Sequence, residues 1–272
     1  MLAALKTTLK RIPLARCAYA RVRSLHDRRE GAKLFENCDD YVRALYRKAD
    51  DGVVLRTRDG LAIAIRRNLW DARIVREIFF ELPYTRHLRL APHPVVVDIG
   101  GYIGDFALYA ARYLGAARVV VYEPTLENFA LLARNIDLNG YGDRITAVRR
   151  AVGEAGEVKL NVQKLEGDEI HVSAYRYADR AERRRVQSVS LEQLLEAHGL
   201  ESVDLLKVDC EGGEYDIFPD APAQALARIR NIAFEYHVVD GWEAKLERAT
   251  SRLRAAGFAL RKDRNIVSAW RD

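Results

Sequence analysis

The strongest restriction on the fold comes from residues 95–123, where two short apolar runs enclose a glycine turn and a helical pattern. VVVDIG is a nearly continuous apolar run, typical of a central parallel strand that is covered on both faces. The turn GGYIG, the helical segment GDFALYAARYL and a second strand-like run, RVVVYE, then follow. A strand and a helix that leads back to a second strand predict a right-handed parallel unit.

The same alternation continues toward the C-terminus. The patterns predict helices at LENFALLARNIDLN, LEQLLEAHG and WEAKLERATSRLRAAG, the last ending at Gly257. They predict strands at RITAVRRAV, VDLLKVD and NIAFEYH, with added strands at EVKLNV and RRVQSVS, and a terminal hairpin from FALRKD and IVSAWR. We therefore predict an α/β fold, with a Rossmann-like, mostly parallel sheet that closes in a C-terminal antiparallel hairpin.

The segment before this alternation has a different character. Residues 53–66, VVLRTRDGLAIAIR, place two alternating runs around Asp59-Gly60, which predicts a hairpin. A helical pattern follows at 71–82, and Pro92 and Pro94 precede the first parallel strand. We predict a basic helical arm at 1–50 and a catalytic domain at 51–272. In that domain, residues 51–94 form a hairpin-and-helix preamble and 95–272 the Rossmann-like core.

Composition excludes several classes of protein. The apolar fraction of 49% is too high for a disordered chain, and no apolar run is long enough for a membrane-spanning helix. The net charge of +5 comes from residues 1–30, where eight basic side chains face two acidic ones. Because the rest of the chain is close to neutral, we predict no nucleic-acid partner. Three distant cysteines favour a reducing, cytoplasmic location.

The basic arm has two interpretations. Its apolar side chains, Leu2, Leu5, Leu9 and Ile12, fall on one side of a helix. One hypothesis is a peripheral contact of residues 1–30 with the inner, anionic face of a membrane. The other, which we favour, is a helix that packs on its own domain or on a second subunit, so that a homo-oligomer stays open.

The glycine turn between the first strand and the first helix predicts a cofactor site, because ligands bind at the carboxyl ends of parallel strands. A nicotinamide motif that ends at Gly104 needs glycine at position 99, where Ile99 stands. Asp98 at the strand end would repel a diphosphate but attract the ammonium and sulfonium of S-adenosylmethionine (AdoMet). Glu123, at the end of the second strand, has two oxygens that can accept from ribose hydroxyls.

At this point the chain resembles the FkbM family of AdoMet-dependent methyltransferases. The similar segments are VVVDIGGYIGDFALYAAR, VVYEPTLENFALLARNIDLN, VSLEQLL, VDLLKVDCEGGEYDIF and IAFEYH, with the Lys207–Gly212 stretch as the most specific. The resemblance covers roughly residues 50–240, so the first 50 residues lie outside it. The loop around Ser173 departs from the pattern of the family, which leaves the region over the substrate unassigned.

The resemblance implies a class I methyltransferase fold and O-methylation of a hydroxyl on a sugar, glycan or polyketide-type natural product. The predicted cofactor is AdoMet, and the acceptor is a small molecule or glycan. The predicted cofactor-binding residues are Asp98, Gly100, Gly101, Tyr102, Gly104, Glu123, Pro124, Ala151 and Asp209.

An alcohol acceptor must lose a proton, so the site needs a general base. The candidates end the fourth and fifth parallel strands: Lys207, Asp209 and Glu211, then Glu235 and His237. We predict His237 as the base, since its ordinary pKa lies near neutrality, with Asp209 and Glu211 orienting it or the substrate. Lys207, inside an apolar strand, needs an acidic partner, for which we predict Asp209 or Glu211.

Alternatives stay open at this level. Asp209, Glu211, Glu235 and His237 could together hold a divalent metal that activates the hydroxyl, although we predict no metal site. The nucleophile could be a nitrogen or a carboxylate. From a different class, the chain could be a nicotinamide-dependent oxidoreductase or a binding module without catalysis.

Overall fold

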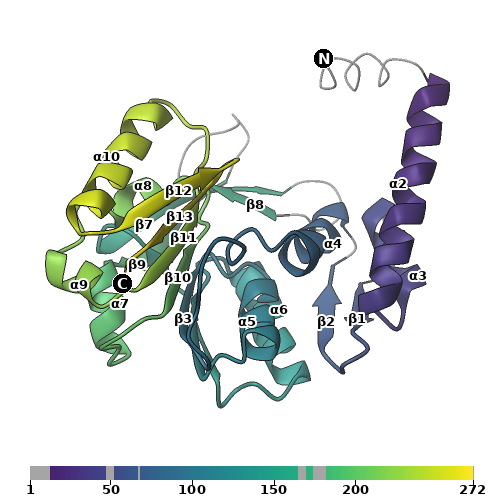
Figure 1. Cartoon of the computed structure of the whole chain (residues 1–272), viewed down its shortest axis with the longest axis horizontal. Coiled ribbons are helices and arrows are strands. Elements are labelled where there is room, and N and C mark those ends of the chain that lie inside the picture. The colour runs from purple at the N-terminus through teal and green to yellow at the C-terminus, as the bar shows by residue number, and fades with distance from the viewer. Residues whose placement is uncertain (1–12, 47–51, 67, 165–169, 174–181, 272) are drawn as a thin grey trace. The chain divides into compact units, whose positions relative to one another are not determined.

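The structure is a computed structural model, which describes residues 13–46, 52–66, 68–164, 170–173 and 182–271 (Figure 1). The amphipathic pattern at residues 2–12 lies outside the described residues. The chain divides into two compact units, Met1–Arg73 and Ile74–Asp272. The sequence placed the end of the arm at residue 50, whereas the packing groups the hairpin with the helices of the first unit. The assignment of domains stays a prediction.

The first unit contains two helices and a two-stranded sheet. The helices are α2 (Pro13–Leu34) and α3 (Cys38–Tyr46), and the strands are β1 (Val53–Arg56) and β2 (Ala62–Ile65). β1 and β2 pair antiparallel, which confirms the hairpin around Asp59-Gly60. Phe35 packs on Tyr41 with ring centroids 4.7 Å apart, and both side chains are buried.

The helix predicted at 71–82 is present, but it changes type along its length. α4 (Leu69–Arg76) is α-helical, and η1 (Glu77–Glu81) continues it as a π-helix that ends at Leu82 in the left-handed region, with φ of 51°. The backbone N–H of Asp71 donates to the side-chain oxygen of Asn68, which starts α4. π-Helical turns occur often beside functional sites, where they shift the residues that follow.

The second unit is built on a seven-stranded sheet with the order β12-β13-β11-β10-β3-β4-β5. The strands are β3 (Val95–Ile99), β4 (Arg118–Tyr122), β5 (Ile145–Val148), β10 (Leu205–Val208), β11 (Asn231–Glu235), β12 (Ala259–Asp263) and β13 (Ile266–Trp270). Strands β5, β4, β3, β10 and β11 pair parallel, and β13 pairs antiparallel with both β11 and β12. This order confirms the predicted Rossmann-like sheet with its terminal hairpin, which is the class I methyltransferase arrangement.

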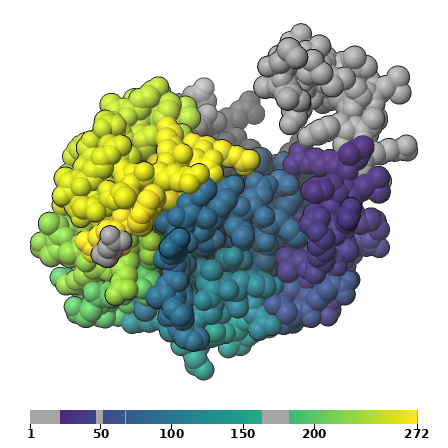
Figure 2. Space-filling view, viewed as in Figure 1, coloured from purple at the N-terminus to yellow at the C-terminus, as the bar shows by residue number. Residues whose placement is uncertain are grey.

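Helices cover both faces of this sheet (Figure 1). They are α5 (Asp105–Tyr113), α6 (Leu126–Leu138), α7 (Leu191–Ala197), α8 (Glu214–Ile217), α9 (Ala223–Ala227) and α10 (Trp242–Ala255). Leu194, Leu226 and Leu253, from α7, α9 and α10, belong to one buried cluster with the strand valines. In Figure 2 the yellow C-terminal hairpin lies against the yellow-green α10. The short helices α8 and α9 have no counterpart in the sequence prediction.

A smaller, four-stranded sheet has the order β6-β9-β7-β8. Its strands are β6 (Ala151–Val152), β7 (Gly156–Lys164), β8 (Ile170–Ser173) and β9 (Glu182–Val189). The two predicted added strands are confirmed as parts of β7 and β9. The predicted strand RITAVRRAV is divided between β5 in the large sheet and β6 in the small one. Ser173 ends β8, and the loop that follows it lies outside the described residues.

Candidate active site

The glycine turn after β3 is held against the next strand and against the turn after β10. The backbone N–H groups of Gly100 and Gly101 both donate to the carbonyl of Tyr122, at 2.9 and 3.0 Å. Gly100 has a φ of +82°, and a Cβ there would lie 1.7 Å from the carbonyl oxygen of Asp209. Position 100 therefore requires glycine, because any side chain would separate the two turns.

Asp98 and Lys207 form a buried ion pair beneath this turn. They are register neighbours on β3 and β10, and Nζ of Lys207 lies 2.9 Å from Oδ1 of Asp98. Nζ also donates to the carbonyl of Gly100 at 2.7 Å. Two sequence predictions are corrected here. Lys207 pairs with Asp98 rather than with Asp209 or Glu211, and Asp98 is fully buried instead of lining the mouth of the crevice.

Other carboxyl groups besides Asp98 act on the ammonium of Lys207. Burial lowers the pKa of Lys207, but the carboxylates of Asp98, Asp209 and Asp105 outweigh it, so the pKa is raised and the amine stays protonated. Burial raises the pKa of Asp98, against the opposing effect of Lys207. Burial also raises the pKa of Asp105 to about 7. Three carboxyl groups thus act on one ammonium.

Glu123 follows β4 and is buried. Its Oε1 accepts from the backbone N–H of Thr125 at 2.9 Å, from the Thr125 hydroxyl, and from Nδ2 of Asn128. Its Oε2 accepts from the backbone N–H of Tyr102 at 3.0 Å. Burial raises the pKa of Glu123, and these hydrogen bonds oppose that rise. Glu123 thereby ties the glycine turn to the start of α6.

The other predicted cofactor residues are spread around this turn. Tyr102 lies in the turn with φ of +46°, and Gly104, with φ of +85°, precedes α5. Pro124 joins β4 to α6. Ala151 lies in β6, where it is the register partner of Ser188 on β9. The structure thus places Ala151 in the smaller sheet and the remaining residues at the carboxyl ends of β3, β4 and β10.

The predicted catalytic residues come together beyond β10 and β11, with Lys207 set apart from them in its buried pair. The imidazole Nε2 of His237 lies 3.7 Å from Oδ1 of Asp209, 3.5 Å from Oε2 of Glu211 and 3.9 Å from Oε1 of Glu235. Sequence reasoning missed Glu214, whose Oε1 accepts from the backbone N–H and from Nδ1 of His237, at 2.9 and 3.1 Å.

Glu214 holds the turn after β10 as well as the histidine. It is fully buried in α8, and its Oε2 accepts from the backbone N–H of Gly212 at 2.8 Å. Glu211, just before, has φ of +53°, an uncommon conformation for a residue with a side chain. In the sequence, the only sign that Glu214 holds this turn and the histidine is its position three residues after Glu211.

The surrounding carboxylates determine the charge of His237. Burial lowers the pKa of His237, but the hydrogen bond to Glu214 and the charges of Asp209 and Glu211 outweigh burial and raise the pKa to about 10. A histidine with this pKa is protonated at neutral pH and cannot accept a proton. The prediction that His237 is the base stays untested, and its charge argues against it.

Tyr84 is a second residue that sequence reasoning missed. Its buried phenol hydroxyl lies 2.8 Å from Oδ2 of Asp209 and 3.0 Å from Oε2 of Glu235. Burial raises the pKa of the phenol well above its ordinary value. Burial and the charge of Asp209 raise the pKa of Glu235 to about 8, and burial raises that of Glu211 to about 7. The raised pKa values place the titration of Glu211 and Glu235 near neutral pH.

Among the described residues, no group of three or more histidine, cysteine and acidic side chains has a geometry that could hold a metal ion.

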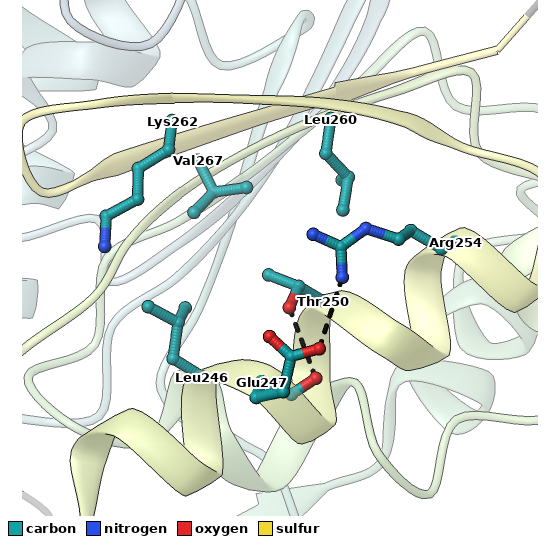
Figure 3. A pocket seen from close by; sticks show the side chains of 7 residues that line it. All are labelled: Leu246, Glu247, Thr250, Arg254, Leu260, Lys262 and Val267. Atoms are coloured by element: carbon teal, nitrogen blue, oxygen red, sulfur yellow. Dashed lines mark hydrogen bonds and ion pairs between the residues drawn. The ribbon is translucent and has the colours of Figure 1, made fainter.

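A separate surface pocket lies between α10 and the C-terminal hairpin, lined by Leu246, Glu247, Thr250, Arg254, Leu260, Lys262 and Val267 (Figure 3). Arg254 pairs with Glu247 across part of it, at 3.4 Å. It contains none of the predicted site residues.

The glycine turn fits a cationic nucleoside cofactor. Oδ2 of Asp98 is buried without a hydrogen-bond partner among the described residues, and an unmatched buried acceptor is costly. Burial raises the pKa values of Asp98 and Asp105, and a positively charged ligand near the turn would favour their ionised forms. Oε2 of Glu123 accepts one hydrogen bond from the described residues, which leaves a lone pair for a hydroxyl donor.

Comparison with known proteins agrees with this geometry. The sequence profile of the methyltransferase FkbM domain matches residues 98–260, more than half of the chain. The chain belongs to the FkbM methyltransferase family. Family and fold together imply that AdoMet is the methyl donor. None of the described helices is long and apolar enough to cross a membrane.

Named relatives of this FkbM-family chain share about a quarter of its residues. The AMB antimetabolite synthetase AmbE of Pseudomonas aeruginosa is 28% identical over 70% of this chain, which spans only 11% of AmbE. The methyltransferase sdnD of Sordaria araneosa is 26% identical, covering 70% of this chain and 83% of sdnD. The 31-O-demethyl-FK506 methyltransferase FkbM of Streptomyces tacrolimicus is 27% identical, covering 76% and 88%.

Among solved structures, an FkbM methyltransferase from Methylobacillus flagellatus is 18% identical, with a TM-score of 0.48 over 72% of this chain and 48% of that one. The fold assignment therefore rests on the family match and on the strand order, not on this superposition.

Proposed function

We propose that this chain is an AdoMet-dependent O-methyltransferase that acts on a hydroxyl group of a small molecule or glycan. The observation that carries the proposal is the position of Asp209. Its backbone N–H donates to the carbonyl of Ile99 at 2.9 Å, directly before the glycine turn, and its carboxylate belongs to the acidic cluster. A carboxylate beside the cofactor turn is well placed to accept a proton from an acceptor hydroxyl.

When bound, AdoMet would supply a methyl group carried on a positively charged sulfur for transfer to the acceptor oxygen. The glycine turn and Glu123 would hold it, since Oε2 of Glu123 keeps a lone pair for a hydroxyl donor. Asp98, buried with Lys207, would act on it from beneath the turn. Asp209 would take the proton of the hydroxyl. Protonated His237 would keep the neighbouring carboxylates together, and Glu211 at the rim would orient the acceptor.

Relatives support a small-molecule acceptor. The Streptomyces relative is named for methylation of an oxygen of demethylated FK506. The other relatives' names include an antimetabolite synthetase and a methyltransferase without a stated acceptor. Every single methyl transfer adds the same mass, so product NMR is needed to separate an O-methyl ether from an N-methyl amine. Lability in base identifies a methyl ester, and a panel of glycosides and macrolide alcohols tests O-methylation directly.

Binding of S-adenosylhomocysteine tests the cofactor half of the proposal. A ligand concentration of 100 times the Kd stabilises the fold by about 2.7 kcal/mol, which a thermal shift detects. Glu123→Gln should weaken binding by roughly tenfold, because one hydrogen bond to a charged acceptor is lost. Glu201→Gln, at an exposed position, is the matched control. Stabilisation by NAD and none by S-adenosylhomocysteine would overturn the proposal in favour of an oxidoreductase.

The predicted membrane contact of residues 1–30 stays a separate hypothesis. Co-sedimentation of the full chain with vesicles that contain anionic lipids, compared with a variant lacking residues 1–30, tests it. Equal sedimentation of the two proteins would reject it.

A further inference from the structure

A buried serine hydroxyl on the smaller sheet lacks a hydrogen-bond partner. Ser188 lies in β9, and only 5% of its surface is exposed. Its Oγ has no partner among the described residues, a property that it shares with Asp98 beneath the glycine turn. A buried hydroxyl without a partner has lost its hydrogen bonds to water and gained none, which destabilises the fold. A ligand that supplies the missing partner removes this penalty.

The side chain of Ser188 faces the side of the smaller sheet on which α6 begins. Side chains alternate along a strand, so Ser188 and Arg184, four positions apart on β9, point to the same face. Nη1 of Arg184 contacts both carboxylate oxygens of Glu127, at 2.7 and 2.8 Å. Glu127 lies in the first turn of α6, four positions after Glu123. This face of β9 is therefore turned toward the segment that begins at Glu123, the carboxylate predicted to bind ribose.

The strands beside Ser188 provide a second connection to Glu123. Ser188 is the register partner of Ala151 on β6 and of Gly156 on β7. Ala151 follows Val148 by three positions, and the carbonyl of Val148 accepts from the backbone N–H of Glu123 at 3.1 Å. Ala151 is a predicted cofactor residue, but its methyl group cannot form a hydrogen bond. A Cβ at Gly156 would meet no described atom within 4 Å. Neither neighbour therefore satisfies the hydroxyl.

The chemistry of AdoMet limits which of its groups can meet this hydroxyl. The charged methionine part is assigned to the glycine turn and the ribose to Glu123. The adenine is left, and its edge carries an exocyclic amine that donates hydrogen bonds beside ring nitrogens that accept them. A serine hydroxyl accepts and donates, so it can pair with this edge.

We propose that the hydroxyl of Ser188 binds the exocyclic amine of the adenine of AdoMet, so that the smaller sheet supplies a specificity-determining contact for the cofactor. The amine donates to Oγ, and no covalent bond changes. The inference rests on the proposed function, because it requires AdoMet as the ligand. Ser188 then destabilises the ligand-free chain and strengthens binding of the cofactor.

Ser188→Ala distinguishes a binding role from a structural one by the sign of the change in stability. Removal of an unpartnered hydroxyl should raise the Tm of the ligand-free chain by about 2–4 °C. The same variant should raise the Kd for S-adenosylhomocysteine about fivefold in titration calorimetry, since one hydrogen bond is lost. A lower Tm, or a variant that fails to fold, would mean that the hydroxyl has a partner within the protein, and either result would overturn the proposal.

An analogue of S-adenosylhomocysteine with hydrogen in place of the exocyclic amine locates the contact on the ligand. The wild-type chain should bind the analogue at least about fivefold more weakly than S-adenosylhomocysteine, and Ser188→Ala should cause no further loss with the analogue. Equal losses for the two ligands would overturn the assignment to the amine.

Ser251→Ala is the matched control. Ser251 is exposed on α10, where its hydroxyl donates to Glu247 at 2.8 Å, so its substitution should leave both Kd values unchanged. A wild-type chain that does not bind S-adenosylhomocysteine would refute the proposed function. Binding by the wild type with an unchanged Kd in Ser188→Ala would overturn only the role of Ser188.

Discussion

The two ends of the site differ in how their buried charges are paired. Beneath the glycine turn, Asp98 is fully buried and its charge is matched by Lys207 on the next strand. Beyond β10 and β11, four acidic side chains surround one histidine: Glu214 is buried at 3.1 Å, and the other three lie at 3.5–3.9 Å and are partly open to solvent. The first region is a closed pair that supports the fold, and the second contains two glutamates whose pKa values are raised to about 7 and 8. The sign of a charge does not distinguish structural residues from reactive ones. The presence of a buried partner of opposite charge does.

The largest effect should follow from breaking the closed pair. Lys207→Met leaves Asp98 buried without its cation, so we expect a loss of about 3–5 kcal/mol in the free energy of unfolding, measured by urea denaturation. Lys207→Met combined with Asp98→Asn removes both charges and should recover much of the loss. Equal destabilisation by the single and double variants would show that the pair is not what stabilises this region.

A smaller loss is expected at Glu214, which joins the turn after β10 to the end of β11. Glu214→Gln turns one acceptor oxygen into a donor that faces N–H groups, which should cost about 1.5–3 kcal/mol. The variant also removes the negative charge of Glu214, which contributes to the raised pKa of His237, so the histidine should titrate at lower pH by NMR. An unchanged His237 titration would contradict this prediction.

The dependence of stability on pH tests the open cluster. The pKa values of Glu211, Glu235 and His237 are raised in the folded state to about 7, 8 and 10. Groups with raised values stabilise the fold below their unfolded pKa and lose that stabilisation as pH rises to the folded value. The free energy of unfolding should therefore fall between about pH 4.5 and 8 through the glutamates, and between about 6.5 and 10 through His237.

Single substitutions show which group causes the dependence of the free energy of unfolding on pH. Each proton changes the free energy of unfolding by at most about 1.4 kcal/mol per pH unit, so Glu235→Gln should flatten the curve below pH 8 and His237→Gln above pH 7. Glu201→Gln should leave both parts of the curve as they are. A Glu235→Gln curve parallel to that of the wild type between pH 5 and 8 would count against a raised pKa for Glu235.

The smallest effect is expected at the rim of the cluster. Glu211 is partly exposed and lies 3.5 Å from His237, so at about pH 4, where its carboxyl group is mostly neutral, Glu211→Gln should change the free energy of unfolding by less than about 0.5 kcal/mol. A loss as large as that of Lys207→Met would erase the distinction between the two regions.

Local patterns predicted most of the fold. Continuous valine runs in β3 and β4 and the helical spacing in α5 and α6 were sufficient, because parallel strands and amphipathic helices are determined by short-range sequence. The division of RITAVRRAV between two sheets was missed, since nothing local separates a bend from a continuous strand. The short helices α8 and α9 were missed because one turn of helix gives no periodic signal.

The site was predicted in its parts but not in its pairings. The glycine turn and the acids after β10 and β11 were identified from their positions at strand ends. The pairing of Lys207 with Asp98 depends on the register of β3 against β10, which a single sequence does not show. Tyr84 was missed because its contacts lie more than 100 positions away along the chain.

The approach of Gly100 to Asp209 restricts how this enzyme could be re-engineered. The backbone of the glycine turn lies directly against the backbone of Asp209, the residue that we propose as the proton acceptor, with no room for a methyl group between them. Libraries that diversify residues 209–213 to change acceptor preference should therefore keep glycine at position 100. A loop grafted at residues 209–213 would have to be transferred together with a glycine turn after β3 that matches it.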